Sequence, residues 1–186
     1  GGLLTFVTAG TCTINADQAG DSTYLPAPQV SRSFTVSPIV PDAPTIGTAT
    51  AGDTQASVAF TAPANTGGTV ITGYTVTVSP PHVPHVTGPS SPIVVNGLTN
   101  GQAYTFTVTA DNSAGTGPAS GASNSVTPKA TQTITFNNPG AQNFGTTPTL
   151  TATSDAGLQV TFTSSTTSVC TVTTGGAVTF VAAGTC

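Results

Sequence analysis

The sequence predicts an all-β chain, and three observations carry that prediction. Threonine and valine are abundant, and their two heavy atoms on Cβ favour pleated sheet over helix. The 21 glycines and 15 prolines provide frequent turn residues along the chain. No segment carries a helical apolar stripe, whereas Tyr104, Phe106 and Val108 alternate with threonines, as in a strand with one buried face.

The first 38 residues are predicted to be the end of one domain. Gly1–Val7 is expected to be a hairpin tip followed by a strand, in which Leu4 and Phe6 point inward. Further strands are expected at residues 12–15 and at Val30–Val36. Asp17, Asp21 and the residues between them have the composition of a tight turn.

Two series of strand signals follow. Between linkers at residues 37–42 and 129–131, the signals recur every eight to twelve positions, which is the spacing of a β-sandwich. The strands expected there cover residues 45–50, 56–61, 70–79, 93–95, 103–110 and 123–127. A second series, which we expect to lack its closing strand, covers residues 133–136, 149–152, 159–163, 169–172 and 177–181.

The last twelve residues of the sequence repeat the first twelve. Nine of the twelve positions are identical between Gly1–Cys12 and Gly175–Cys186, at an offset of 174 residues. This period is too long for a solenoid repeat but fits two domains of ordinary sandwich size. We therefore expect one period of a tandem array, divided into the end of one domain (1–38), a complete domain (39–130) and the start of the next (131–186).

The repeat also predicts how the divided domain is completed. Residues 131–186 and residues 13–38 together amount to about 82 residues, the size of one sandwich. Residues 13–38 of one copy would thus supply the strands that residues 131–186 of the preceding copy lack. Two arrangements are open: the copies are covalently continuous, or neighbouring subunits exchange strands.

The middle domain resembles a fibronectin type III domain. Residues 97–110 contain the Leu-x-x-Gly-x-x-Tyr pattern of that family at Leu98, Gly101 and Tyr104. In the family the tyrosine hydroxyl ties the corner between the two sheets to upstream backbone. The usual core tryptophan is absent, and we expect Phe60 to take its place.

The divided domain is similar to bacterial Ig-like repeats of long secreted surface proteins. The resemblance rests on residues 133–136, 160–162, 169–172 and 183–186. Together the two resemblances imply tandem Ig-like and fibronectin type III β-sandwiches with extracellular spacer or adhesive roles, usually without catalysis.

The three cysteines are consistent with this arrangement. Because Cys12 and Cys186 are equivalent positions, each period contains two cysteines, Cys170 and Cys186. A disulfide between them would close a loop and stabilise the folded state by roughly 3 kcal/mol. It would also indicate an oxidising, extracellular location. Cys12 would then pair with a residue of the preceding copy. The alternative is that the cysteines are free thiols packed as small hydrophobic side chains.

Composition argues against several classes of function. Only 4% of the residues are charged, with one lysine and one arginine, so no basic patch is expected to bind nucleic acid or anionic lipid. No apolar run reaches the roughly 20 residues of a membrane span. We expect no enzyme activity, because the sequence lacks glutamate and has no clustered aspartates for paired-carboxylate chemistry.

We also expect no cofactor and no metal site. His82 and His85 lie in a proline-rich segment without further ligands, and solvated loop residues are the simpler interpretation. Asp17 and Asp21 lack the alternating acidic pattern of a calcium loop, which favours a plain turn.

These observations predict a non-catalytic structural repeat of an extracellular bacterial stalk, fibre or filament. Its partners would be copies of itself. One alternative is an adhesive module whose loop at residues 79–91 binds a glycan or a protein. The other is a spacer within a secreted multidomain enzyme.

Overall fold

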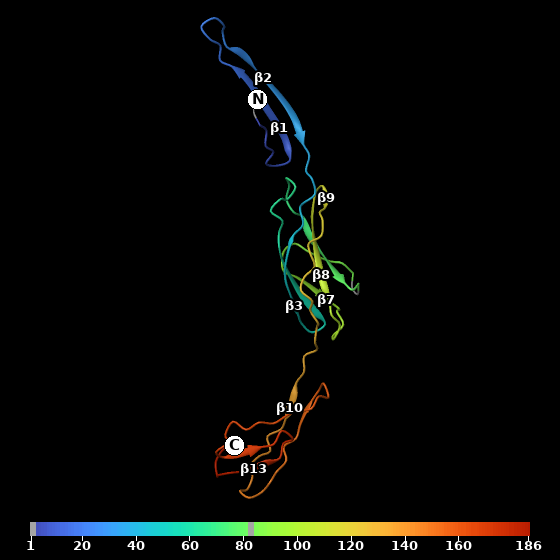
Figure 1. Cartoon of the computed structure of the whole chain (residues 1–186), viewed down its shortest axis with the longest axis vertical. Coiled ribbons are helices and arrows are strands. Elements are labelled where there is room, and N and C mark those ends of the chain that lie inside the picture. The colour runs from blue at the N-terminus through green and yellow to red at the C-terminus, as the bar shows by residue number, and fades with distance from the viewer. Residues whose placement is uncertain (1–2, 82–83) are drawn as a thin grey trace. The chain divides into compact units, whose positions relative to one another are not determined.

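The computed structural model describes residues 3–81 and 84–186 (Figure 1). The chain divides into two compact units, Gly1–Ala130 and Thr131–Cys186. Every regular element in the described residues is a strand, which confirms the all-β prediction. The described residues therefore include no helix long and apolar enough to cross a membrane.

The first unit begins with an antiparallel hairpin of β1 (Gly10–Gln18) and β2 (Ala27–Val36). Both strands cover the segments predicted at 12–15 and 30–36 and extend beyond them. Their pairing runs from Gly10 opposite Val36 to Gln18 opposite Ala27. Because side chains alternate across a strand, the hairpin has two faces of different composition.

The strand predicted within Gly1–Val7 is wrong for the residues that the structure describes, which begin at Leu3. Residues 3–7 have no strand structure, whereas the equivalent residues Val178–Phe180 form β13 in the second unit. There β13 pairs with β12 (Cys170–Val172). Among the described residues, no strand pairs with Leu3–Val7.

A two-layer sandwich forms the rest of the first unit. One sheet has the order β3 (Thr45–Ala51), β4 (Gln55–Thr61) and β7 (Ile93–Asn96). The other has the order β6 (Val86–Gly88), β5 (Gly73–Ser79), β8 (Thr105–Asn112) and β9 (Gly115–Thr116). The longer strands match the predicted ones. The sequence analysis missed β6 and β9, which are too short to show a period.

The alternating side chains of both sheets meet in one core. Val58 and Val95 project from one sheet and Val76, Phe106 and Val108 from the other, and all five are fully buried. Also in this core, the Phe60 ring packs against the Tyr74 ring, with centroids 4.7 Å apart. The sandwich is therefore stabilised by burial of apolar faces from two sheets.

The strand predicted at residues 123–127 is wrong, although this segment lies along β8. Along residues 120–126, the amides of Ser120, Ser123 and Val126 donate to the carbonyls of Val108, Phe106 and Tyr104, at 2.8–2.9 Å. The segment thus advances three residues for every two of β8, which breaks the strand period. Two serine hydroxyls accept the β8 amides that a regular strand would pair: Ser120 from Val108 and Ser123 from Phe106.

The second unit contains two separate strand pairs. β10 (Ile134–Phe136) pairs with β11 (Ala152–Ser154), and β12 pairs with β13 (Val178–Phe180). The strand predicted at 149–152 overlaps the observed strand β11 only at Ala152. Thr149 forms an isolated bridge with Ala177. Residues 159–163 are extended but form no strand, so that prediction is wrong. Among hydrophobic residues here, Cys170 and Val178 are buried.

Replacing the central aromatic ring of the sandwich tests the core. We expect Phe106→Ala to lower the free energy of unfolding of this domain by about 3–5 kcal/mol, through lost burial and a cavity. Val94→Ala is the matched control, since Val94 is 45% exposed on β7, and should cost under about 1 kcal/mol. Urea unfolding followed by tyrosine fluorescence measures both, because Tyr74 and Tyr104 lie in this core. Equal losses would contradict the assignment.

Candidate functional site

The corner between the two sheets is built around Tyr104. Its side chain is 1% exposed, and its hydroxyl accepts a hydrogen bond from the Thr99 N–H at 3.2 Å. Tyr104 also exchanges two backbone hydrogen bonds with Val126, at 2.8 and 2.9 Å. The residue thereby ties β8, the preceding turn and the chain near Val126 together.

The other two residues of the predicted corner lie in the same turn. Leu98 is buried, and its N–H donates to the Thr54 carbonyl at 2.9 Å. Gly101 has φ of +84°, in the left-handed region that favours glycine, and its N–H donates to the Pro128 carbonyl at 2.8 Å. The structure thus brings Leu98, Gly101 and Tyr104 together in one structural site.

Asn112 holds the linker before the sandwich, a role that the sequence analysis missed. Its buried side-chain amide donates to the carbonyls of Ile39 and Thr66, at 2.7 and 2.9 Å. Nearby, the Ile39 N–H donates to the Gly67 carbonyl at 3.0 Å. The only sequence signal is an asparagine at the end of a strongly alternating strand, and its partners are distant in sequence.

The Asn124 side chain binds the backbone of β3, another role that was not predicted. Its side-chain oxygen accepts the Ala49 N–H at 2.8 Å, and its side-chain nitrogen donates to the Ala49 carbonyl at 3.0 Å. The amide group therefore mimics a strand neighbour of β3. Like Asn112, it performs a structural task.

The second unit contains a disulfide between Cys170 and Cys186, whose Cα atoms lie 5.7 Å apart. Cys170 is completely buried, and the Ser164 hydroxyl donates to its carbonyl at 2.9 Å. Cys12 is a free, half-buried thiol on β1 opposite Phe34 of β2. The bond links β12 to the chain beyond β13.

The histidine and aspartate candidates make local contacts. His85 Nδ1 lies 2.8 Å from the Thr77 hydroxyl, whereas His82 lies outside the described residues. Asp17 accepts from the Gln29 side chain at 2.8 Å. Residues 3–81 and 84–186 contain no group of three His, Cys, Asp or Glu side chains arranged to hold a metal ion.

Two aspartates act as backbone acceptors in turns. Hydrogen bonds from the N–H groups of Thr23 and then Tyr24 hold the pKa of Asp21 below its ordinary value. Asp155 accepts from the Thr133 hydroxyl at 2.6 Å and from the Thr133 N–H at 3.0 Å. These bonds, the hydroxyl first, lower the pKa of Asp155 and fasten the start of the second unit.

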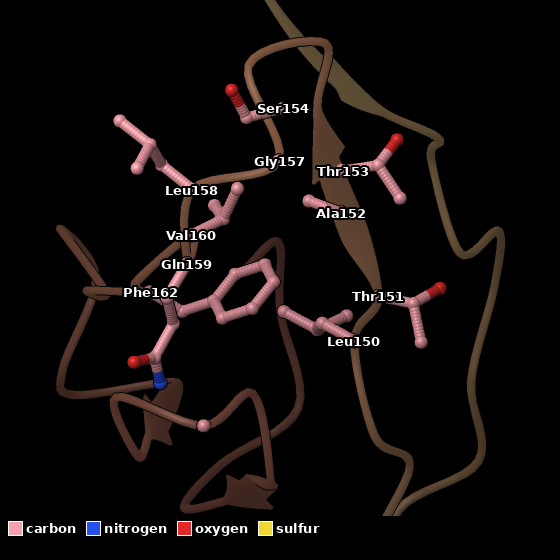
Figure 2. A pocket seen from close by; sticks show the side chains of 11 residues that line it. Leu150, Thr151, Ala152, Thr153, Ser154, Gly157, Leu158, Gln159, Val160 and Phe162 are labelled. Carbon is pink, nitrogen blue, oxygen red and sulfur yellow. The ribbon is translucent and has the colours of Figure 1, made fainter.

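Two hollows occur in the second unit. The smaller, about 400 Å³, is open and lies between β11 and residues 157–162. Figure 2 shows Leu150 and Phe162 directed toward one another there, while Thr151 and Thr153 point away. No ionisable side chain lines it, so the hollow offers apolar contact and no acid–base chemistry.

The larger hollow is a groove of about 850 Å³ whose lining combines aromatic and aliphatic side chains with serine, threonine and amide side chains; we call it the second-unit groove. Its principal apolar walls are Phe136, Phe144, Pro148, Leu150 and Phe180. The disulfide-bonded Cys186 and the residues just before it form a further wall. No charged side chain lines this groove either.

The sequence of the sandwich in the first unit matches a known domain family. Residues 42–126 match the fibronectin type III domain family. This segment is a fibronectin type III domain. The match begins after the Asn112-bound linker residue Ile39 and ends at Val126, the partner of Tyr104. Fibronectin type III domains are typically structural or binding modules and are not themselves catalytic.

Solved structures are similar to this chain at low sequence identity. Rat CD45 extracellular domains d3–d4 are 16% identical with a TM-score of 0.51, over 68% of this chain and 67% of that one. Titin domains A168–A170 are 21% identical, with a TM-score of 0.48, over 66% and 41%.

The structure of titin kinase and its flanking domains is 24% identical with a TM-score of 0.42, over 49% of this chain. The chain spans only 18% of the length of that structure. No curated protein matches the sequence.

Removing one hydroxyl tests the corner of the fibronectin type III domain. We expect Tyr104→Phe to lower the free energy of unfolding by about 1–2 kcal/mol, because the buried acceptor for the Thr99 N–H is lost. Tyr24→Phe should change it by less than about 0.5 kcal/mol, since Tyr24 is exposed. Urea unfolding by circular dichroism measures both. A neutral Tyr104→Phe would show that the corner bond does not stabilise the domain.

The Asp155 carboxylate should make the stability of the second unit depend on pH. Its folded pKa lies below the ordinary value of 3.8, so its contribution is present above the unfolded pKa and is lost as pH falls through the folded pKa. We therefore expect Asp155→Asn to lower the melting temperature slightly near neutral pH. The difference should shrink as pH falls below 3.8 and vanish once the pH lies below the folded pKa. A difference that persists unchanged at acid pH would contradict this role.

Proposed function

We propose that this chain is a non-catalytic structural repeat of an extracellular bacterial stalk, fibre or filament. Fibronectin type III and Ig-like domains would alternate along it. One observation carries the proposal: equivalent twelve-residue segments, 174 residues apart, lie on either side of a fibronectin type III domain. A period that contains one such domain and the parts of a second is what a tandem array of two domain types requires.

The disulfide supports an extracellular location. Structural disulfides persist in oxidising compartments and are rare where thiols are kept reduced. Cys170 and Cys186 are bonded, and Cys170 is fully buried within a unit that has little other buried apolar surface. A covalent link contributes most in such a small unit, because it limits the freedom of the unfolded chain.

The anchored linker supports a load-bearing role. Ile39 is bound on both its N–H and its carbonyl, by Gly67 and by the Asn112 side chain. Downstream, the Asp42 N–H donates to the Asn65 carbonyl at 3.1 Å. The chain entering the fibronectin type III domain is therefore fastened to its surface, as suits a stalk better than a free tether.

Electron microscopy of the native material tests the proposal. Negatively stained particles that carry this sequence should be elongated, with a width of one sandwich. Isolated compact particles would overturn the structural role. Reducing, denaturing electrophoresis of the same material distinguishes the two array types, because covalently continuous copies migrate far above the 18.1 kDa of this 186-residue chain.

A further inference from the structure

The β1–β2 hairpin has one polar and one apolar face. On the polar face, hydroxyl and amide side chains bond across the strands, Thr13 with Ser33 at 2.7 Å and Ser31 with Asn15 at 2.6 Å. The opposite face carries apolar side chains from both strands and is largely solvent-exposed: Cys12, Ile14, Ala16, Val30 and Phe34. An isolated two-stranded hairpin is marginally stable, and an antiparallel sheet normally packs one such face on a core.

The apolar face of the hairpin carries one cation, Arg32, opposite Ile14. The guanidinium folds back and donates to the Ser31 carbonyl at 2.9 Å. This contact holds the guanidinium against the backbone of β2. A long cationic side chain can cover apolar surface with its aliphatic part while its charged group stays in water, so Arg32 is compatible with docking of this face.

The second-unit groove also exposes apolar side chains to solvent. Its aromatic walls are open to solvent, with Phe136 51% and Phe144 67% exposed. Cys170 and Val178 are the buried hydrophobic residues described within 131–186, which is a small core for 56 residues. The unit thus has apolar surface that needs a further layer.

The twelve-residue repeat relates these two surfaces. Phe6 is the equivalent of Phe180, and the Phe6 ring packs edge-on against Phe34 of the hairpin, with centroids 6.0 Å apart. Phe180 lines the groove. In the array, Phe180 would be followed by the β1–β2 hairpin of the next copy, just as Phe6 is followed by β1–β2 in this chain. Phe34 of that next hairpin would then pack against Phe180, as Phe34 packs against Phe6 here.

The cysteines are placed consistently with this relation. Cys12 lies on β1, and its equivalent Cys186 forms part of the groove wall, where it is bonded to Cys170. β1 starts at Gly10, whose equivalent is Gly184, also in that wall. The first residues of an equivalent hairpin therefore already lie at the edge of the groove.

We propose that the second-unit groove is the docking site for the apolar face of the β1–β2 hairpin of a second copy of this sequence. Residues 131–186 of one copy and residues 13–38 of the next then form a single sandwich. The inference rests on the proposed structural role and specifies the contact between successive repeats. Because the donor and acceptor surfaces differ, the association is head-to-tail, and the stalk or fibre proposed above requires the open form of such an association.

An extended chain tests the docking directly. A second copy of residues 13–38 is joined after Cys186, and amide hydrogen exchange in residues 131–186 is compared with that of the 186-residue chain. We expect exchange around β10 and β13 to slow at least about tenfold, because the appended hairpin covers the groove. Fluorescence of an apolar dye bound to the chain should fall in parallel.

Two substitutions in the appended copy make the test specific. Phe34→Asp places a charge on the apolar face and should abolish the protection. Ser33→Asp places the same charge one residue away on the polar face, opposite Thr13, and should leave the protection intact. Circular dichroism of the fibronectin type III domain checks that both chains are folded.

Three outcomes would overturn the docking. They are an extension that gives no protection, equal effects of the two substitutions, and an unrelated ligand that protects the groove in place of the hairpin. Elongated particles seen by microscopy together with an unprotected groove would reject the docking and leave the structural role standing. Compact native particles with a protected groove would reject the structural role alone.

Discussion

The structure depends on one constraint: a β-sheet with an apolar face needs a second layer to cover it. The fibronectin type III domain meets this constraint internally, because the valines of β4 and β7 pack against Val76, Phe106 and Val108 of the facing sheet. The hairpin and the second unit use the same kinds of strand but leave apolar side chains exposed. The hairpin and the second unit form separate two-stranded sheets, whereas the central domain has two larger sheets that cover one another.

Side-chain amides and hydroxyls complete the sandwich where regular pairing stops. Ser120 and Ser123 accept amides of β8, Asn124 pairs with both backbone groups of Ala49, and Asn112 binds the linker carbonyl of Ile39. Each of these residues satisfies backbone groups that burial would otherwise leave unpaired. In this chain with few charges, uncharged polar side chains therefore satisfy backbone groups beyond the regular strand pairs.

The equivalent segments at the two ends of the repeat show how far local sequence determines structure. Val178-Thr179-Phe180 forms β13 because β12 lies beside it, whereas Leu4-Thr5-Phe6 forms no strand. The alternation of Tyr104, Phe106 and Val108 is sufficient to predict a strand with one buried face, since that face is covered within the same domain. The strand expected at 123–127 failed because its three-for-two register along β8 is set by serine hydroxyls.

By itself, the sequence determined the all-β class, most strands of the central domain and the corner pattern at Leu98, Gly101 and Tyr104. Those features follow from side-chain period and turn chemistry, which act over a few residues. Tertiary structure alone decided which segments pair, which asparagines hold the linker and β3, and where apolar surface is left open as a groove. These outcomes depend on contacts between residues far apart in the chain, such as Asn112 with Ile39 and Asn124 with Ala49, and local patterns do not specify those contacts.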